Sequence, residues 1–94
     1  MMKAIYGIEQ STKFRRQYRK LMKRGYNESL FNKVLTLLAA GKPLAEKYHD
    51  HALHGEYTGY RECHITPDWL LVYKIKANVL ILVLHRTGTH SDLF

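Results

Sequence analysis

Apolar residues recur at helical spacing in the first part of the chain. Between positions 13 and 24 they recur at i, i+4, i+7 and i+8, which are Phe14, Tyr18, Leu21 and Met22. This stripe predicts an amphipathic helix that begins at an N-cap, Ser11 or Thr12, and runs to about Arg24. Gly25 then follows as a C-cap. A short first strand is predicted before this helix, from Lys3 to Ile8.

A second helix is predicted from Glu28 to Ala40. Asn27 is its N-cap, and Gly41 with Pro43 ends it. Its apolar band is wide and consists of Leu30, Phe31, Val34, Leu35, Leu37 and Leu38. Because this helix has few charges, we expect it to be the better buried of the two. The two helices together should form a hairpin that packs on one face of a sheet.

In the stretch from Gly59 to Lys74, the residues follow the pattern of two β-strands joined by a turn at positions 66–69. Pro67 presets φ for a turn, and Asp68 can bond back to nearby backbone. If Thr66 and Trp69 pair across a two-residue loop, His64 lies opposite Leu71 and shares a face with Trp69 and Tyr73. The other face would carry Cys63, Ile65, Leu70 and Val72, with Arg61 and Lys74 at its open end.

We interpret the second of these faces as core and the first, which holds His64, as a half-exposed working surface. A loop of odd length would reverse the assignment, because side chains alternate along a strand.

The run from Val79 to Arg86 is apolar on both faces and predicts a central strand after a turn at 76–78. A two-residue loop would pair Trp69 with Arg86 and place Arg86 on the face of His64. A three-residue loop would place His85 there instead, and the sequence leaves both open. The polar segment 87–94 holds His90 and closes on Leu93 and Phe94, so we expect it to dock on the sheet.

Composition narrows the class of protein. The 94 residues suit one domain, residues 1–94, and 46% of them are hydrophobic. The formal net charge of +7 favours a polyanionic partner, nucleic acid first and an acidic protein second, although a merely soluble basic surface is the alternative. Seven cations lie between Thr12 and Arg24 with no acid among them, which favours contact with phosphate or an acidic partner.

The single cysteine, Cys63, excludes a disulfide framework and is expected to be a buried structural thiol. With a single cysteine, a cytoplasmic, reducing location is the default prediction. No N-terminal signal pattern is seen, and the longest apolar run, Val79 to Leu84, is too short to span a membrane. The spacing of His49, His51 and His54 is compatible with a metal. A zinc site needs further convergent ligands, however, so we predict neither metal nor cofactor.

Several polar groups can reach the working surface: His51, His64, Asp68, Arg86 and His90, with Trp69, Tyr73 and Phe94 as flat apolar surfaces. The sequence has no glycine-rich phosphate loop and no nucleophile elbow. Acid–base groups, a guanidinium and stacking surfaces on a basic protein suit RNA cleavage without a metal. In that reaction the ribose 2′-hydroxyl attacks the adjacent phosphorus.

The sequence resembles the YafQ branch of the RelE/ParE superfamily of bacterial toxins. The residues that carry the resemblance are Asp50-His51, Leu53, Gly55, Gly59-Tyr60-Arg61, His64, Pro67-Asp68-Trp69, Tyr73-Lys74, Arg86-Thr87-Gly88-Thr89-His90 and Leu93-Phe94. One departure is Ala52, where close relatives often have proline.

The resemblance implies an α+β fold, RelE-like, with a curved antiparallel sheet and an N-terminal helical hairpin on one face. It also implies a ribonuclease that cleaves mRNA in the ribosomal A site and is held inactive by an acidic antitoxin, through which the complex would bind operator DNA. The matching catalytic residues are His51, His64, Asp68, Arg86 and His90. We expect Trp69, Phe94, Arg61 and Lys74 to bind RNA. His49, His54 and His85 are outside the pattern.

A second hypothesis is that the protein has the same fold but no catalytic activity. The chain would then be a non-catalytic or gyrase-directed binding module, in which the basic helix matters and His64, Arg86 and His90 are dispensable.

Overall fold

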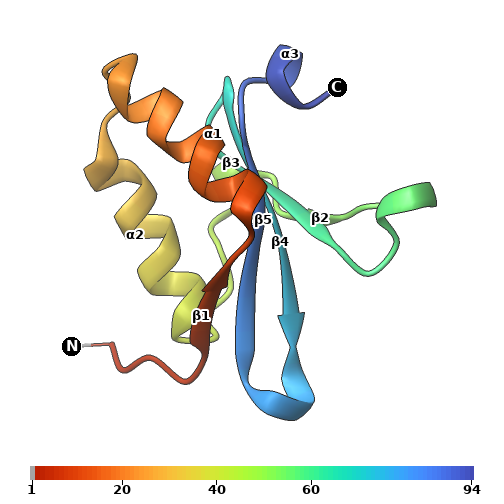
Figure 1. Ribbon diagram of the computed structural model, residues 1–94. Coiled ribbons are helices and arrows are strands. Elements are labelled where there is room, and N and C mark those ends of the chain that lie inside the picture. Colours follow the sequence, from red (N-terminus) through yellow and green to blue (C-terminus); the bar gives the residue numbers. More distant parts are fainter. Residues whose placement is uncertain (1) are drawn as a thin grey trace.

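The computed structural model describes residues 2–94, in which the two longer helices lie on one face of an open five-stranded sheet (Figure 1). The strands are β1 (Gly7–Gln10), β2 (His51–Ala52), β3 (Arg61–Thr66), β4 (Trp69–Lys76) and β5 (Ile81–Gly88), in the spatial order β1-β5-β4-β3-β2. The helices are α1 (Thr12–Lys23), α2 (Glu28–Ala39) and α3 (His90–Leu93), with 3₁₀ turns η1 (Glu46–Tyr48), η2 (Gly55–Tyr57) and η3 (Ala77–Val79).

The predicted α+β class with a helical hairpin on one face is confirmed, and two details of the sheet are corrected. The first strand is Gly7–Gln10 and not residues 3–8. It runs parallel to β5, so the sheet is mixed rather than wholly antiparallel. A parallel neighbour needs a long crossover, and the helices α1 and α2 are part of that connection.

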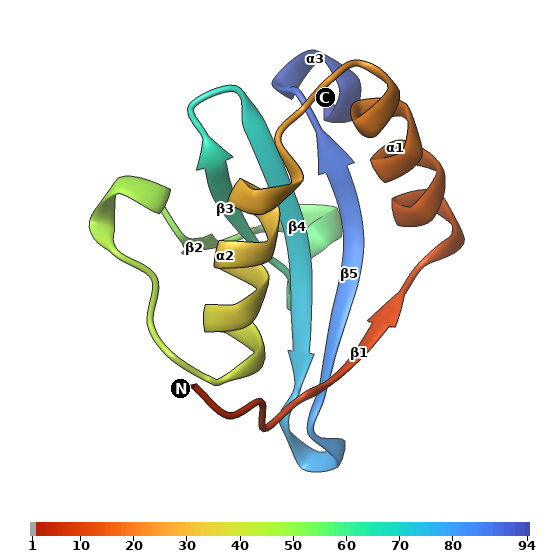
Figure 2. The same ribbon diagram turned by 90° about the vertical axis from the view of Figure 1, so that its left-hand side faces the viewer.

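The helices form where the sequence predicts them. Ser11 is the N-cap of α1: its Oγ accepts from the amide of Phe14 at 2.9 Å and donates to the carbonyl of His85 at 2.6 Å. Asn27 caps α2 in the same way, through the amide of Ser29. Figure 2 shows α2 in front of β3 and β4, with α1 beside β5. The caps therefore fix where each helix begins and, through His85, tie α1 to the sheet.

The β3–β4 hairpin closes as predicted at Thr66 and Trp69, but a bulge at Ile65 shifts the pairing behind it. His64 lies opposite Leu70, not Leu71. Trp69, Leu71 and Tyr73 therefore face the helices together with Cys63, while Leu70 and Val72 belong to a cluster on the other face. The expectation that Trp69 and Tyr73 share a face with His64 is wrong, because an extra residue reverses the alternation.

Trp69 is part of the core. The residue is 1% exposed, the ring of Tyr26 lies nearly perpendicular to its ring with the two centres 5.2 Å apart, and Phe31 stacks at 6.3 Å. Its Nε1 donates to Thr87 Oγ1 at 2.9 Å, and that hydroxyl donates to the carbonyl of Leu70 at 2.8 Å. A ring without a free face cannot stack on a base. The predicted place of Trp69 on an RNA-binding surface is therefore wrong.

The β4–β5 connection follows neither of the two loops considered above. Lys76 pairs with Ile81, which closes a four-residue loop, and Arg86 pairs with Val72 rather than with Trp69. The register then shifts, and His85 is the extra residue. His85 and Arg86 both contact Tyr57, so the bulge brings the two residues to one side.

Cys63 is fully buried, as predicted, and burial raises the pKa of its thiol well above the ordinary value. Within residues 2–94, no helix has the length and apolar character needed to cross a membrane.

Thr87→Val tests the buried bond to Trp69. The exchange keeps the shape of the side chain but leaves the Trp69 N–H without an acceptor, so the free energy of unfolding should fall by about 1–3 kcal/mol. Urea unfolding can be followed by the fluorescence of Trp69, the only tryptophan. Thr36→Val, at an exposed position on α2, is the matched control and should change little. Equal stabilities for the two variants would contradict the role given to the bond.

Candidate active site

The face of β2–β5 that turns away from α1 and α2 is called the open face here. Two cross-strand rows organise it. One row runs through His51, Glu62, Val72 and Arg86, and the other through His64, Leu70 and Gly88. With strands spaced about 4.8 Å apart, the first row extends about 14 Å from His51 to Arg86 between Cα atoms. Leu70 and Val72 are buried in the middle by Leu93, Leu53 and Tyr60.

Three histidines gather at the β2–β3 end of the open face. The ring of His64 lies 5.4 Å from that of His49 and 6.5 Å from that of His51, between centres. His51 Nδ1 lies 2.7 Å from the carbonyl oxygen of His49, and its Nε2 lies 3.5 Å from Glu62 Oε1. An oxygen atom thus faces each nitrogen of His51, and these contacts fix the orientation of its ring.

Aromatic rings gather at the other end, around Arg86. The guanidinium donates through Nη1 to the hydroxyl of Tyr57. The ring of Phe94 lies 6.4 Å from Tyr57 and 5.3 Å from the ring of His90, and Phe94 is 60% exposed. Tyr57, which the prediction lacked, therefore links the predicted residues Arg86 and Phe94, and Phe94 in turn contacts His90.

His85 stacks in the same cluster, 4.5 Å from the ring of Tyr60. Partial burial lowers the pKa of His85, and the positive charges of Arg86 and Lys13 lower it further. The imidazole is therefore mostly neutral at neutral pH, beside a permanent cation.

Two buried polar atoms in the first row have no hydrogen-bond partner within residues 2–94. They are Glu62 Oε2 and Arg86 Nε, which belong to the two residues that flank Val72 in the row. Buried polar groups are normally paired, and unpaired ones concentrate where a protein keeps them for function at a cost in stability. This pattern supports the open face as the site.

Of the other predicted residues, Asp68 and Arg61 lie apart from these clusters, and Lys74 lies beside the aromatic one. Asp68 is exposed in the turn between β3 and β4. Arg61 lies on the helix side, as expected, where its Nη2 is 3.1 Å from Asp50 Oδ2. Lys74, expected on the same side, instead lies on the open face with its Nζ 5.2 Å from the ring centre of Tyr60. Lys74 can thus add positive charge to the open face, and Arg61 cannot.

A groove of about 330 Å³ borders the histidine cluster. Its lining includes His64 and Pro67 from the hairpin, Leu30 and Lys33 from α2, and Lys47 from η1. The two lysines make its rim basic, so the groove suits an anionic chain that continues past His64.

Sequence reasoning missed Tyr57 and Glu62 and left out His49 and His85. The His-x-His spacing of His49 and His51 was one available signal. His49 takes a left-handed conformation, φ 47°, which brings its ring back toward His64. The position of His85 depends on the bulge in β5, for which the sequence carries no signal that we recognise.

The chain can now be compared with known proteins. Residues 6–94 match a family described as bacterial toxin of type II toxin-antitoxin system, YafQ. The chain belongs to this family. The mRNA interferase toxin YafQ of Escherichia coli K12 is 38% identical over 88 residues, which cover 93% of this chain and 94% of that protein.

Solved structures agree. A metal-bound toxin from Helicobacter pylori is 47% identical with a TM-score of 0.89, covering 95% of this chain and 99% of that one. The E. coli DinJ–YafQ toxin–antitoxin complex matches at 36% identity with a TM-score of 0.87, covering 96% of this chain and 98% of the matched one. The sequence-based assignment to the YafQ branch is thereby confirmed.

The metal-bound relative raises the question of a metal in this YafQ-family chain. Within residues 2–94, no group of three histidine, cysteine or acidic side chains is arranged to hold an ion. The nearest approach to one is the histidine cluster, where the two nitrogens of His51 already face the His49 carbonyl and Glu62. As arranged here, these residues do not fit a metal ion.

The lowered pKa of His85 predicts a dependence of stability on pH. The unfolded chain binds a proton at this residue near its ordinary pKa of 6.5, and the folded chain binds it only at lower pH. The free energy of unfolding should therefore fall as the pH drops from about 7 to 5. His85→Gln should remove part of this slope in urea unfolding at several pH values, whereas His54→Gln, at an exposed position, should not. An unchanged slope in His85→Gln would contradict the assignment.

Proposed function

We propose that this protein is a ribosome-dependent mRNA endoribonuclease, the toxin of a type II toxin–antitoxin system, which cleaves mRNA in the ribosomal A site. Its family membership and the relatives named mRNA interferase toxin support this. The observation that carries the proposal is the open face itself. Neighbouring histidine rings lie at one end of it, and a partly buried guanidinium, which Tyr57 links to an exposed phenylalanine, lies at the other.

The reaction requires one group to take the proton from the ribose 2′-hydroxyl. The 2′ oxygen then attacks the adjacent phosphorus, the bond from phosphorus to the 5′ oxygen breaks, and a second group protonates that leaving oxygen. The products are a 2′,3′-cyclic phosphate and a free 5′-hydroxyl. We assign the proton transfers to His51, His64, Asp68 and His90 as a set.

The order of the groups along the open face suits this chemistry. His64 lies in the row that ends at Gly88, and His90 follows two residues later in the sequence, at the start of α3. Arg86 lies in the neighbouring row, and Tyr57 holds its guanidinium. A phosphate between the rows would have acid–base groups on both sides and the charge of Arg86 beneath it.

The exposed ring of Phe94 is a surface on which an unstacked base can lie. Lys74, held over Tyr60, adds a positive charge along the same face. We keep Phe94 and Lys74 as RNA-binding residues of the proposal, and Trp69 is not among them.

The remaining partners follow from charge. The cations of α1 lie on the side of the helix away from Phe14 and Leu21, which are buried. This basic helix face suits binding to ribosomal RNA. A protein that acts on ribosomes would work in the cytoplasm, and we propose that this one does so as a single domain. An acidic antitoxin is the expected inhibitor, as the solved complex of the E. coli relative with DinJ supports. Operator DNA would be bound through that antitoxin.

Replacing two histidines tests the catalytic assignment. His64→Ala combined with His90→Ala should abolish cleavage of ribosome-bound mRNA, since each positioned acid or base contributes about 10²–10⁴ in rate. His54→Ala, outside both clusters, is the control and should cleave normally. Mapping mRNA ends on translating ribosomes is the measurement. Wild-type cleavage by the double variant would contradict the mechanism.

Chelation tests the absence of a metal step. Cleavage by the wild-type protein should continue in EDTA, because protein side chains transfer the protons. The ribosomes are kept intact in this experiment by a cation that EDTA does not bind. The readout is primer extension across the A-site codon, compared with the same protein and free mRNA. Loss of cleavage upon chelation, restored by a transition metal, would contradict this prediction.

A further inference from the structure

The helix α3 cannot hold itself in place. It has four residues, His90–Leu93, and isolated helices this short are not stable in water. Yet it carries His90, and Phe94 directly follows it. Whatever fixes α3 therefore also fixes two residues of the proposed site, and the contacts that do so come from far along the chain.

The first of these contacts lie within the turn before α3. Asp92 Oδ2 accepts from the backbone amide of Thr89 at 2.9 Å, and Thr89 Oγ1 accepts from the amide of Asp92 at 3.2 Å. This reciprocal pair is a capping box, which satisfies two amides that a helix start leaves free. The bond from the Thr89 amide lowers the pKa of Asp92, so its carboxylate is charged at neutral pH.

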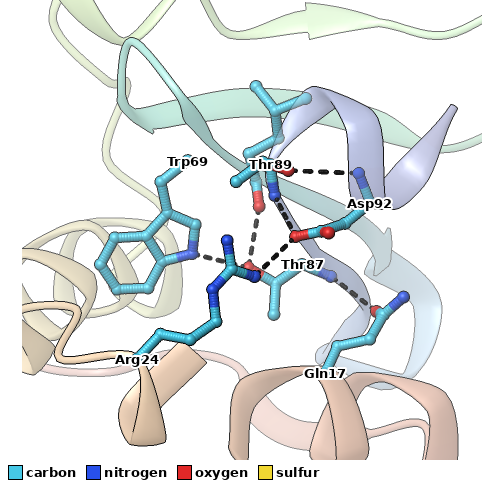
Figure 3. A network of polar contacts seen from close by, with 7 residues as sticks. Gln17, Arg24, Trp69, Thr87, Thr89 and Asp92 are labelled. Carbon is cyan, nitrogen blue, oxygen red and sulfur yellow. Dashed lines mark hydrogen bonds and ion pairs between the residues drawn. The ribbon is translucent and has the colours of Figure 1, made fainter. Parts of the chain in front are cut away.

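The second contact reaches across to α1. Arg24 is the C-cap residue of that helix, and its Nη1 lies 3.2 Å from the same oxygen, Asp92 Oδ2. Figure 3 shows Arg24 and the Thr89 amide meeting this single oxygen from two sides. Asp92 thus has two functions at once: it caps α3, and it anchors the cap to α1.

The packing around this pair leaves little room for another arrangement. A Cβ at Gly88 would lie 2.8 Å from the Cβ of Asp92, so only glycine allows this approach. Below it, the amide of Thr87 donates to Gln17 Oε1 at 3.0 Å, a second link between β5 and α1. On the other side Leu93 is buried against the open-face cluster.

We propose that Arg24 and Asp92 are positioning residues of the active site: by joining the cap of α3 to the end of α1, they hold His90 and Phe94 at the working end of the open face. Neither residue touches substrate in this role. The inference rests on the proposed function for its catalytic consequence, and on the contacts alone for its structural part.

Hydrogen exchange reads the structural part directly. The amide of Leu93 donates to the Thr89 carbonyl and that of Phe94 to the His90 carbonyl, so both report on α3. In Asp92→Ala, which loses the cap and the ion pair, their exchange should speed up by roughly tenfold or more, while the amides of β4 stay unchanged.

A pair of milder variants isolates the link to α1. Asp92→Asn keeps an oxygen for the Thr89 amide but loses the charge that Arg24 meets, so it should match Arg24→Ala. Combining the two should add nothing further, because they break one interaction. Lys23→Ala removes a neighbouring α1 charge, and Ser91→Ala changes an exposed residue of α3. Both should leave the exchange of Leu93 and Phe94 as in the wild type.

Cleavage of ribosome-bound mRNA reads the catalytic part. Asp92→Asn should lower the maximal single-turnover rate several-fold with little change in the ribosome concentration at half-saturation, and Ser91→Ala should leave both unchanged. Wild-type exchange of Leu93 and Phe94 in Asp92→Ala would overturn the structural part, and a wild-type maximal rate in Asp92→Asn would overturn the catalytic part. If the wild-type protein cut no mRNA, the proposed function would fall, and the exchange measurement would still decide the structural part.

Discussion

The hydrogen bond between Trp69 and Thr87 joins the parts of this molecule that the candidate site needs. Trp69 begins β4, directly after the turn with Asp68, and Thr87 lies near the end of β5, two residues after His85. Through the Thr87 amide the same pair reaches Gln17 on α1. Because all of these groups are buried or partly buried, water cannot replace the bonds at little cost, and the two strands and the helix are held in one register.

In that register, the two faces of β4 pack against different parts of the molecule. Trp69, Leu71 and Tyr73 pack toward the helices, while Leu70 and Val72 pack under the open face. A slip of this strand by one residue would exchange the two sets of apolar side chains between the faces, where each would meet the wrong neighbours. The polar groups of the site are therefore carried by the neighbouring strands, β3 and β5, and by the loops before and after them.

Sequence reasoning predicted the elements well because they depend on local signals. The caps at Ser11 and Asn27 and the turn at Pro67 lie where the pattern places them. Besides the bounds and direction of the first strand and the length of the β4–β5 loop, it failed at Ile65 and His85, each of which is the extra residue of a bulge. A bulge is decided by packing across the sheet rather than by local preference, and it reverses every assignment of faces beyond it.

Bulges also decided which of the predicted site residues reach the open face. His51 and His64 reach the open face as expected, and Arg86, whose side the sequence left open, reaches it through a bulge. Trp69 does not reach it, because its register depends on the residue that bulges. Tyr57 and Glu62 carry no motif, and only their neighbours in three dimensions give them a role. Spacing along a chain identifies candidate catalytic residues better than it identifies the residues that contact and orient them.

The parallel pairing of β1 with β5 has a consequence for how the protein comes into being. Gly7 pairs with Ile81, and the apolar sides of α1 and α2 rest on strands that follow them in the sequence. During synthesis, the core under the helical hairpin therefore cannot form until most of the described chain has been made. β5, which pairs with both β1 and β4, comes after the other four strands in the sequence. The nascent protein holds no site until that strand has left the ribosome, since none of the open-face rows is complete without it.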